Sequence, residues 1–114
     1  MLVLGWVYII NYEAVPNFLK IGFSTKNPTF HAIEFDGANS DSTYRVIYTA
    51  FVEKPSYIEQ AAHLILASKR EHNGWFRCSH ADAISAIRSC AKSILIERDN
   101  CAEYKRPEER IQMS

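Results

Sequence analysis

The 114-residue sequence has few cysteines, glycines and prolines, and it carries no net charge. Its three cysteines, Cys78, Cys90 and Cys101, are odd in number and form no C-x-x-C pair, which excludes a disulfide framework and a zinc or redox motif of ordinary spacing. Basic and acidic side chains are equal at 13 each, so the global positive field that many nucleic-acid-binding proteins use is absent. Any binding of a polyanion must therefore use a local patch.

A long hydrophobic run is also missing. The apolar segment Met1–Ile10 ends at Asn11, about half a membrane span from its start, and it has no basic segment before it. We therefore expect a strand at this position, a reducing cytoplasmic location and no membrane partner.

The residues that are present are sufficient for one hydrophobic core. The chain is 47% hydrophobic and 23% charged, which is ordinary for a globular domain. Polarity rises after Asn100, and Pro107 interrupts the last segment. We predict one domain over residues 1–99 and a polar tail over residues 100–114.

Aromatic and β-branched runs predict three strands, and amphipathic runs predict three helices. The strands are expected at Gly5–Ile10, Leu19–Phe23 and Arg45–Val52, the helices at Pro28–Asp36, Ser56–Arg70 and Ser79–Glu97, and a short extended piece from Trp75 to Cys78. Ser56 with Glu59, and Ser79 with Asp82, have the spacing of capping boxes. This order predicts the α+β class, with a small three-stranded antiparallel sheet flanked by helices.

Four short motifs follow one another along these elements. They are Gly5-Trp6-Val7-Tyr8, Lys20-Ile21-Gly22, Glu59-x-x-x-His63 and Gly74-Trp75-Phe76. In this order and spacing the chain, from Leu4 to Ile87, resembles the GIY-YIG nuclease superfamily, and within it the T5orf172 / Mug113-like branch.

The resemblance implies a metal-dependent DNA endonuclease that hydrolyses phosphodiester bonds with one Mg²⁺ or Mn²⁺ ion. It also implies DNA as the partner, catalytic roles for Tyr8 and Lys20, metal binding by Glu59 and a catalytic role for His63. Lys20 stands where the second tripeptide of the superfamily has tyrosine. The same replacement of tyrosine by lysine is found in the T5orf172-like branch.

His31 departs from the pattern, because the family has arginine at this position in its first helix. Arginine keeps its charge and offers a planar fork to phosphate oxygens, whereas histidine near neutral pH is mostly uncharged. We therefore expect His31, in the phosphate-clamping position, to weaken or abolish turnover. A naturally weakened nuclease and a substitution that suppresses a toxic activity are both open explanations.

The chemistry of these side chains is consistent with such a site without the resemblance. Tyr8 and Lys20 lie on adjacent strands of one hairpin, where they can face the same side, and either could receive a proton. One carboxylate, Glu59, is enough to anchor Mg²⁺ when water and phosphate complete the coordination. Structural explanations stand beside these roles: Glu59 as a capping residue, Tyr8 in the core and Lys20 as an outward strand residue.

Three further residues have two explanations each. His63 and Arg70 are expected to share one helical stripe with Glu59, and that stripe could contact nucleic acid or be a solvated polar face. Trp6 is either a base-stacking residue or part of the core.

Other functions also remain open at this stage. A DNA- or protein-binding module could keep the scaffold without turnover, and a small phage- or plasmid-type regulator could act on a host protein. For an endonuclease of this size, cleavage of both DNA strands would need a homodimer or a partner subunit.

Overall fold

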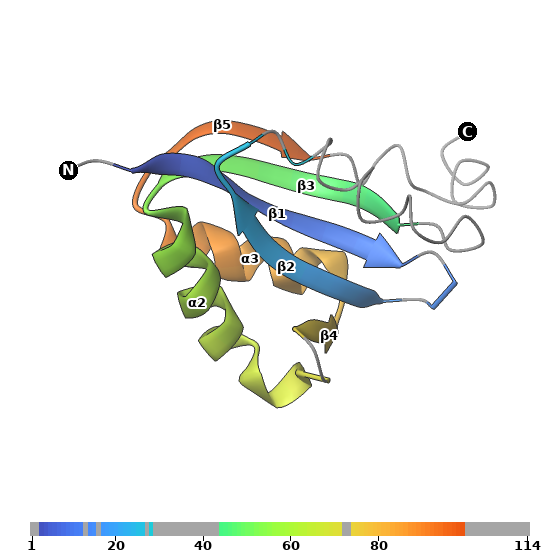
Figure 1. The fold of residues 1–114 in the computed structure, drawn as a ribbon. Coiled ribbons are helices and arrows are strands. Elements are labelled where there is room, and N and C mark those ends of the chain that lie inside the picture. The colour runs from blue at the N-terminus through green and yellow to red at the C-terminus, as the bar shows by residue number, and fades with distance from the viewer. Residues whose placement is uncertain are drawn as a thin grey trace, which may run out of the picture.

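The chain forms one antiparallel sheet with two helices against one of its faces (Figure 1). The computed structural model describes residues 3–12, 14–15, 17–26, 28, 44–71 and 74–99. The strands are β1 (Leu4–Tyr12), β2 (Phe18–Ser24), β3 (Tyr44–Glu53), β4 (Trp75–Arg77) and β5 (Ile94–Asp99), and the helices are α2 (Pro55–Ile65), the 3₁₀ turn η1 (Ala67–Lys69) and α3 (His80–Cys90). The strand order is β4-β2-β1-β3-β5.

The helices divide the sheet into an inner face, which they cover, and an outer face on the opposite side. Side chains alternate along a strand, so β1 sends Val7 and Ile9 to the inner face and Tyr8 to the outer face. The core lies between the inner face and the helices. Its largest members include Val7, Ile9, Leu19, Ile21, Ile47, Tyr48, Ile58, Leu66, Phe76, Ile84 and Ile87.

Gly5 allows α2 to begin close against the sheet. A Cβ at Gly5 would lie 2.8 Å from Pro55 Cγ and 2.9 Å from the backbone oxygen of Ser24. Pro55 is buried at the first position of α2, and Lys54 before it has a left-handed backbone with φ of 55°. The expected capping box of Ser56 and Glu59 is therefore wrong, because Pro55 starts the helix before Ser56 and no side chain caps it.

Helix α2 is also shorter than expected. It ends at Ile65, so the prediction of a helix reaching Arg70 is wrong, and η1 follows instead. Ile65 at the end of α2 is 54% exposed, whereas the next residue, Leu66, is buried. The predicted helix over residues 28–36 lies outside the described residues except for Pro28, which is helical and fully buried.

The sheet has five strands rather than the expected three. The extended piece at Trp75 joins the sheet as β4, which pairs with Phe18 to Lys20 of β2. The predicted helix Ser79–Glu97 is wrong in its second half, because α3 ends at Cys90 and Ile94–Asp99 pairs with β3 as β5. Its start is confirmed: Ser79 is the N-cap, and its hydroxyl accepts a hydrogen bond of 3.1 Å from the backbone N–H of Asp82.

A β-bulge interrupts the pairing of β1 with β3. Ile9 pairs with Tyr48 and Ile10 pairs with Val46, which leaves Ile47 as the extra residue. The pairing of β1 with β2 has no such interruption, so the relative positions of their side chains follow simple alternation.

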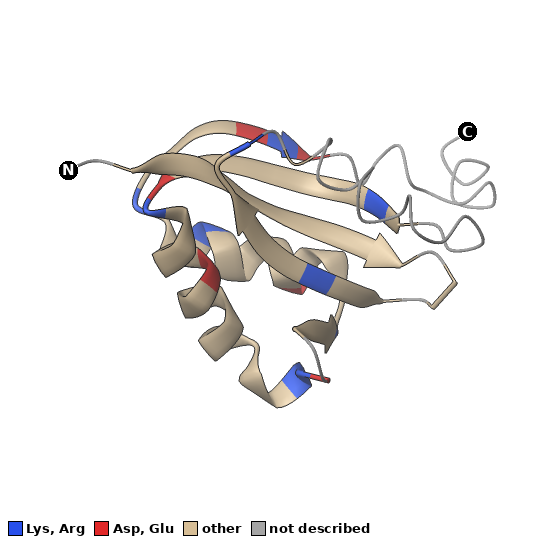
Figure 2. Ribbon diagram, in the orientation of Figure 1, with Lys and Arg blue, Asp and Glu red and all other residues tan. Residues whose placement is uncertain are grey.

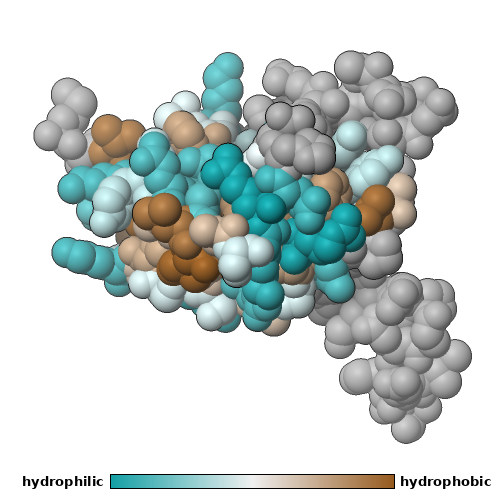
Figure 3. Space-filling view, turned by 90° about the horizontal axis from the view of Figure 1, so that it is seen from below, coloured by the Kyte–Doolittle hydropathy of each residue, from teal (hydrophilic) through white to brown (hydrophobic). Residues whose placement is uncertain are grey.

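Neither helix could cross a lipid bilayer: within the described residues, α2 and α3 have 11 residues each and are too short for a membrane span. The surface seen from below, on the side of the helices, is mixed and has a patch of hydrophobic side chains beside hydrophilic ones (Figure 3).

Glu97 joins β5 to the rest of the fold. Its Oε2 accepts hydrogen bonds from the Tyr48 hydroxyl at 2.5 Å and from Arg88 Nε at 2.6 Å. The bond from Arg88, and then the bond from Tyr48, lower the pKa of the Glu97 carboxyl below its ordinary value of 4.5. The ionised carboxylate therefore links β3, α3 and β5.

Glu97 should make the stability of the protein sensitive to acid. A carboxyl whose pKa is lowered by folding stabilises the native state above its unfolded pKa, and this contribution is lost as pH falls through the lowered value. In Glu97→Gln we expect a smaller loss of unfolding free energy between about pH 7 and about pH 3 than in the unaltered chain, measured by urea unfolding. Glu53→Gln, at an exposed glutamate of β3, is the matched control. An identical loss in Glu97→Gln and the unaltered chain would contradict the prediction.

Candidate active site

Tyr8 and Lys20 lie on the same face of the sheet, as the sequence predicts. Tyr8 pairs with Gly22, and Ile10 pairs with Lys20, so alternation places Tyr8, Gly22 and Lys20 on the outer face. β1 contains no charged residue, and Lys20 is the one charged residue of β2 (Figure 2). The hairpin therefore places a phenol and a single cation on one surface.

Gly22 determines where the Tyr8 ring lies. A Cβ at Gly22 would be 2.6 Å from the Tyr8 hydroxyl oxygen and 2.8 Å from Cζ of the same ring. The ring therefore extends across Gly22, from β1 over β2, and only glycine leaves room for it. The glycine of the Lys20-Ile21-Gly22 tripeptide thus has a packing reason.

The Tyr8 phenol is held in its protonated form. Tyr8 is only 4% exposed. Burial first, and the negative charge of Glu59 second, raise the pKa of the Tyr8 phenol above its ordinary value of 10.0. At neutral pH the hydroxyl therefore keeps its proton and can donate a hydrogen bond, and this favours a donor role over the base role that the sequence left open.

Glu59 is placed by α2 and is not a capping residue. Its side chain is 19% exposed, while Ile58 and Ala62 of the same helix are buried in the core. Because Glu59 raises the pKa of Tyr8, the carboxylate and the phenol belong to one electrostatic environment although they come from different elements.

His63 attaches α2 to β2. Its Nε2 lies 2.9 Å from the backbone oxygen of Ile21 and 3.8 Å from Oε2 of Glu59, and its ring packs edge-on against Phe76 at 4.9 Å. A carbonyl oxygen only accepts hydrogen bonds, so Nε2 carries the proton and donates it to Ile21. This arrangement makes Nε2 unsuitable as a metal ligand and ties the helix that carries Glu59 to β2.

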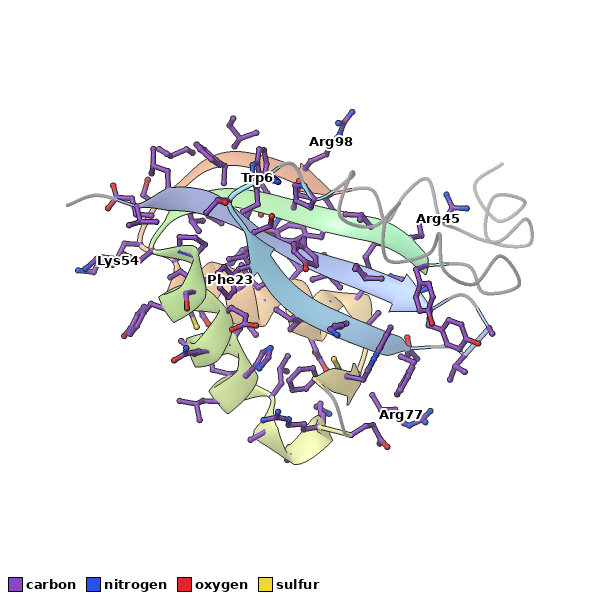
Figure 4. The ribbon with its side chains drawn as sticks, viewed as in Figure 1. Trp6, Phe23, Arg45, Lys54, Arg77 and Arg98 are labelled. Carbon is purple, nitrogen blue, oxygen red and sulfur yellow. The ribbon has the colours of Figure 1, made fainter. Side chains whose placement is uncertain are left out.

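The structure does not place the other predicted site residues with Tyr8, Lys20 and Glu59. Arg70 does not share a helical stripe with Glu59 and His63, because α2 ends at Ile65 and Arg70 instead forms an isolated bridge with Phe76. Trp6 is half-buried on the outer face and packs against Phe51 at 4.9 Å, near the start of β1 (Figure 4). His31 lies outside the described residues.

Trp75 and Phe76 lie on opposite faces of the sheet. Phe76 is fully buried in the core beneath the helices, whereas Trp75 is half-buried and pairs with Lys20 on the outer face. Lys20 Nζ lies 5.8 Å from the centre of the Trp75 ring. The alternation in the short run Trp75-Phe76-Arg77 was the signal for this, because only one of two adjacent aromatic residues of a strand can enter the core.

The donor set fits a hard divalent cation with few protein ligands. Among the described residues, no three His, Cys, Asp or Glu side chains form a group that could hold a metal ion. Mg²⁺ and Mn²⁺ accept oxygen ligands, and Mg²⁺ is commonly held by one or two carboxylates while water and a substrate phosphate supply the rest. Glu59, partly exposed and beside a positioned histidine, is the residue that would hold such an ion.

The fold and the site together define a small antiparallel α+β domain with a tyrosine, a lysine and a glutamate around one strand, β2. The family model of the T5orf172 domain matches residues 5–91, and the chain belongs to this family. The family is associated with GIY-YIG and HNH-like nucleases, which makes a nuclease-like or DNA-binding module the class of this domain. Comparisons with curated proteins and with solved structures gave no significant match.

The electrostatic link between Tyr8 and Glu59 can be measured directly. In Glu59→Gln we expect the pKa of Tyr8 to fall, because the negative charge that opposes the phenolate is removed, yet to stay above 10.0, because burial remains. The measurement is an NMR titration of tyrosine labelled at ¹³Cζ, with Tyr8→Phe to assign the signal. Glu53→Gln should leave the titration unchanged. An unaltered Tyr8 titration in Glu59→Gln would mean that the charge of Glu59 does not act on the Tyr8 phenol.

Proposed function

We propose that this chain is a metal-dependent DNA endonuclease of the GIY-YIG type, with activity reduced by histidine at position 31. Two observations carry the proposal: the β1–β2 hairpin places Tyr8 and Lys20 on one face, and the carboxylate of Glu59, from α2, is near enough to raise the pKa of the Tyr8 phenol. Membership of the T5orf172 family supports it. The branch within the superfamily, Mug113-like, remains a prediction.

Each residue has a role that its surroundings support. Glu59 would hold Mg²⁺ or Mn²⁺, which when bound polarises the phosphate and the attacking water. Tyr8, which keeps its proton, donates a hydrogen bond to the attacking water or to a phosphoryl oxygen and so orients it. Lys20 supplies positive charge to the phosphate, and His63 holds α2 so that Glu59 stays near Tyr8.

His31 is the reason for expecting low activity. A charged, bidentate arginine on the phosphoryl oxygens typically contributes about 3 kcal/mol or more to stabilising the transition state, roughly a hundredfold in rate. Without that contact, turnover should be slow in the unaltered chain. The same residue favours a second candidate function, a DNA-binding module without turnover.

Nicking of supercoiled plasmid DNA tests the proposal. We expect the unaltered chain to nick slowly with Mg²⁺ or Mn²⁺ and not with EDTA, and His31→Arg to nick roughly a hundredfold faster. Glu59→Gln, added to the faster form, should abolish nicking, and Glu53→Gln should not. Because Glu59 caps no helix, its substitution should change the free energy of unfolding by less than about 0.5 kcal/mol. A folded, DNA-binding His31→Arg protein without nicking would favour the second function.

Gly22→Ala tests whether the position of the Tyr8 ring matters. The added methyl group displaces the hydroxyl end of a side chain, so the cost to stability should be no more than about 1–3 kcal/mol. Misplacement of the hydroxyl by about 1 Å should lower the nicking rate by up to about a hundredfold.

The matched comparison is a double-mutant cycle with Tyr8→Phe. If Gly22 acts through Tyr8, Gly22→Ala combined with Tyr8→Phe should nick no more slowly than Tyr8→Phe alone. Additive losses would mean that Gly22 serves another part of the site.

A further inference from the structure

Four aromatic side chains form a cluster on the outer face of the sheet. They are Trp75 of β4, Phe18 of β2, Tyr12 of β1 and Tyr44 of β3, one from each of four consecutive strands. Phe18 and Trp75 are stacked at 4.9 Å with 4° between their planes, and Tyr12 and Tyr44 are stacked at 5.2 Å with 25°. Trp75 also contacts Tyr44 at 6.0 Å and Tyr12 at 6.4 Å, so the two pairs form one aromatic platform.

The aromatic platform is rigid but not enclosed. All four rings are half-buried, so each keeps part of its surface accessible. Rings stacked on one another on a sheet lose little freedom when they bind a ligand. None of the four is a member of the hydrophobic core cluster. The platform is therefore a surface feature of the sheet.

Two cations lie beside the aromatic platform. Lys20 Nζ is 5.8 Å from the centre of the Trp75 ring, and Arg77 Cζ is 5.3 Å from the centre of the Phe18 ring. Arg77 extends away from β4 (Figure 4) and forms an exposed ion pair of 3.5 Å with Glu71, an interaction that a phosphate can replace at small cost. β1, β2 and β4 contain no acidic residue. The chemistry offered here is a set of π-faces flanked by positive charge.

This combination fits a ligand with flat bases and a negative backbone. Bases stack on aromatic side chains only when they are unpaired, because the faces of paired bases are occupied within the duplex. The exposed hydrophobic residues of α2, which are Tyr57, Leu64 and Ile65, include a single aromatic ring. Unpaired nucleotides are therefore a better match to the aromatic platform than an apolar protein surface is.

We propose that the aromatic platform binds unpaired nucleotides of DNA by stacking. Lys20 lies beside the aromatic platform and also belongs to the candidate active site, so the bound single strand would lie next to the phosphate to be cleaved. This inference rests on the proposed function, because it takes the neighbouring site to be one that cleaves DNA. It narrows the substrate class to DNA with a single-stranded segment beside the cleavage position.

Binding measured without hydrolysis tests the inference separately from the nuclease activity. The probes are fluorescein-labelled oligonucleotides of about 20 nucleotides, one oligo(dT), one abasic strand of equal length and one duplex, studied by anisotropy in EDTA. We expect the unaltered chain to bind oligo(dT) at least about fivefold more tightly than the abasic strand, because stacking on one ring typically contributes that much or more.

Substitutions then assign the binding to the aromatic platform. Trp75→Ala and Phe18→Ala should each weaken oligo(dT) binding by about fivefold or more and leave abasic binding unchanged. Arg77→Gln should weaken both and lower the salt slope by about one unit. Tyr57→Ala, at an aromatic residue that is 66% exposed on α2, is the matched control and should have no effect. If a ring variant does not fold, quenching of Trp75 fluorescence in Trp6→Phe by oligo(dT) gives the same information.

Equal affinity for oligo(dT) and the abasic strand would overturn the inference, as would tighter binding of the duplex or no binding of any oligonucleotide. Loss of nicking in Glu59→Gln with retained stacking would leave it intact. Conversely, metal-dependent nicking by a chain that does not distinguish oligo(dT) from the abasic strand would reject the platform while supporting the endonuclease.

Discussion

The contact between α2 and β2 is the constraint on which the site depends. β4 covers β2 only from Phe18 to Lys20, and α2 attaches farther along this strand through the hydrogen bond from His63 to the Ile21 carbonyl. Gly5 allows Pro55 to begin the helix against β1. A helix held at these two points places Glu59 near enough to raise the pKa of the Tyr8 phenol. Without it, the phenol and the carboxylate would belong to unrelated parts of the chain.

Small residues are therefore as important to the site as the reactive ones. Gly5 and Gly22 have no side chain, yet each leaves the space that a larger group occupies: the ring of Pro55 in one case and the ring of Tyr8 in the other. The chain has only four glycines, and two of them serve this purpose. The motifs Gly5-Trp6-Val7-Tyr8 and Lys20-Ile21-Gly22 therefore belong to one packing arrangement, in which the ring of Tyr8 lies over Gly22.

Local patterns predicted the first three strands and the start of α3 because each of these elements has its own sequence signal. Alternation in β1 and β2 also placed Tyr8 and Lys20 on one face. β5 could not be predicted in the same way, since Ile87, Ala91 and Ile94 fit helical spacing and only pairing with β3 decides for a strand. The true partners of Glu97, Tyr48 and Arg88, are equally invisible from local sequence.

Within the candidate site, the sequence predicted which residues share a surface better than what each one contacts. Glu59 fitted a capping box until Pro55 proved to be the first helical residue. The hydrogen bond from His63 to Ile21 depends on a tertiary contact that spacing does not reveal. Arg70 does not lie on the predicted stripe, because the end of α2 depends on the packing of the buried Leu66 as well as on helix propensity.

The bulge at Ile47 determines which side chains of β3 reach the outer face. In a regular strand, Tyr48 and Tyr44 would point to the same side, since they are four residues apart. The extra residue reverses the alternation, so one tyrosine enters the core and the other stacks on Tyr12. If the same sequence paired without the bulge, Ile47 would lie opposite Ile10 and Arg45 opposite Tyr12. The bulge therefore decides whether this end of the outer face carries an aromatic side chain or a basic one.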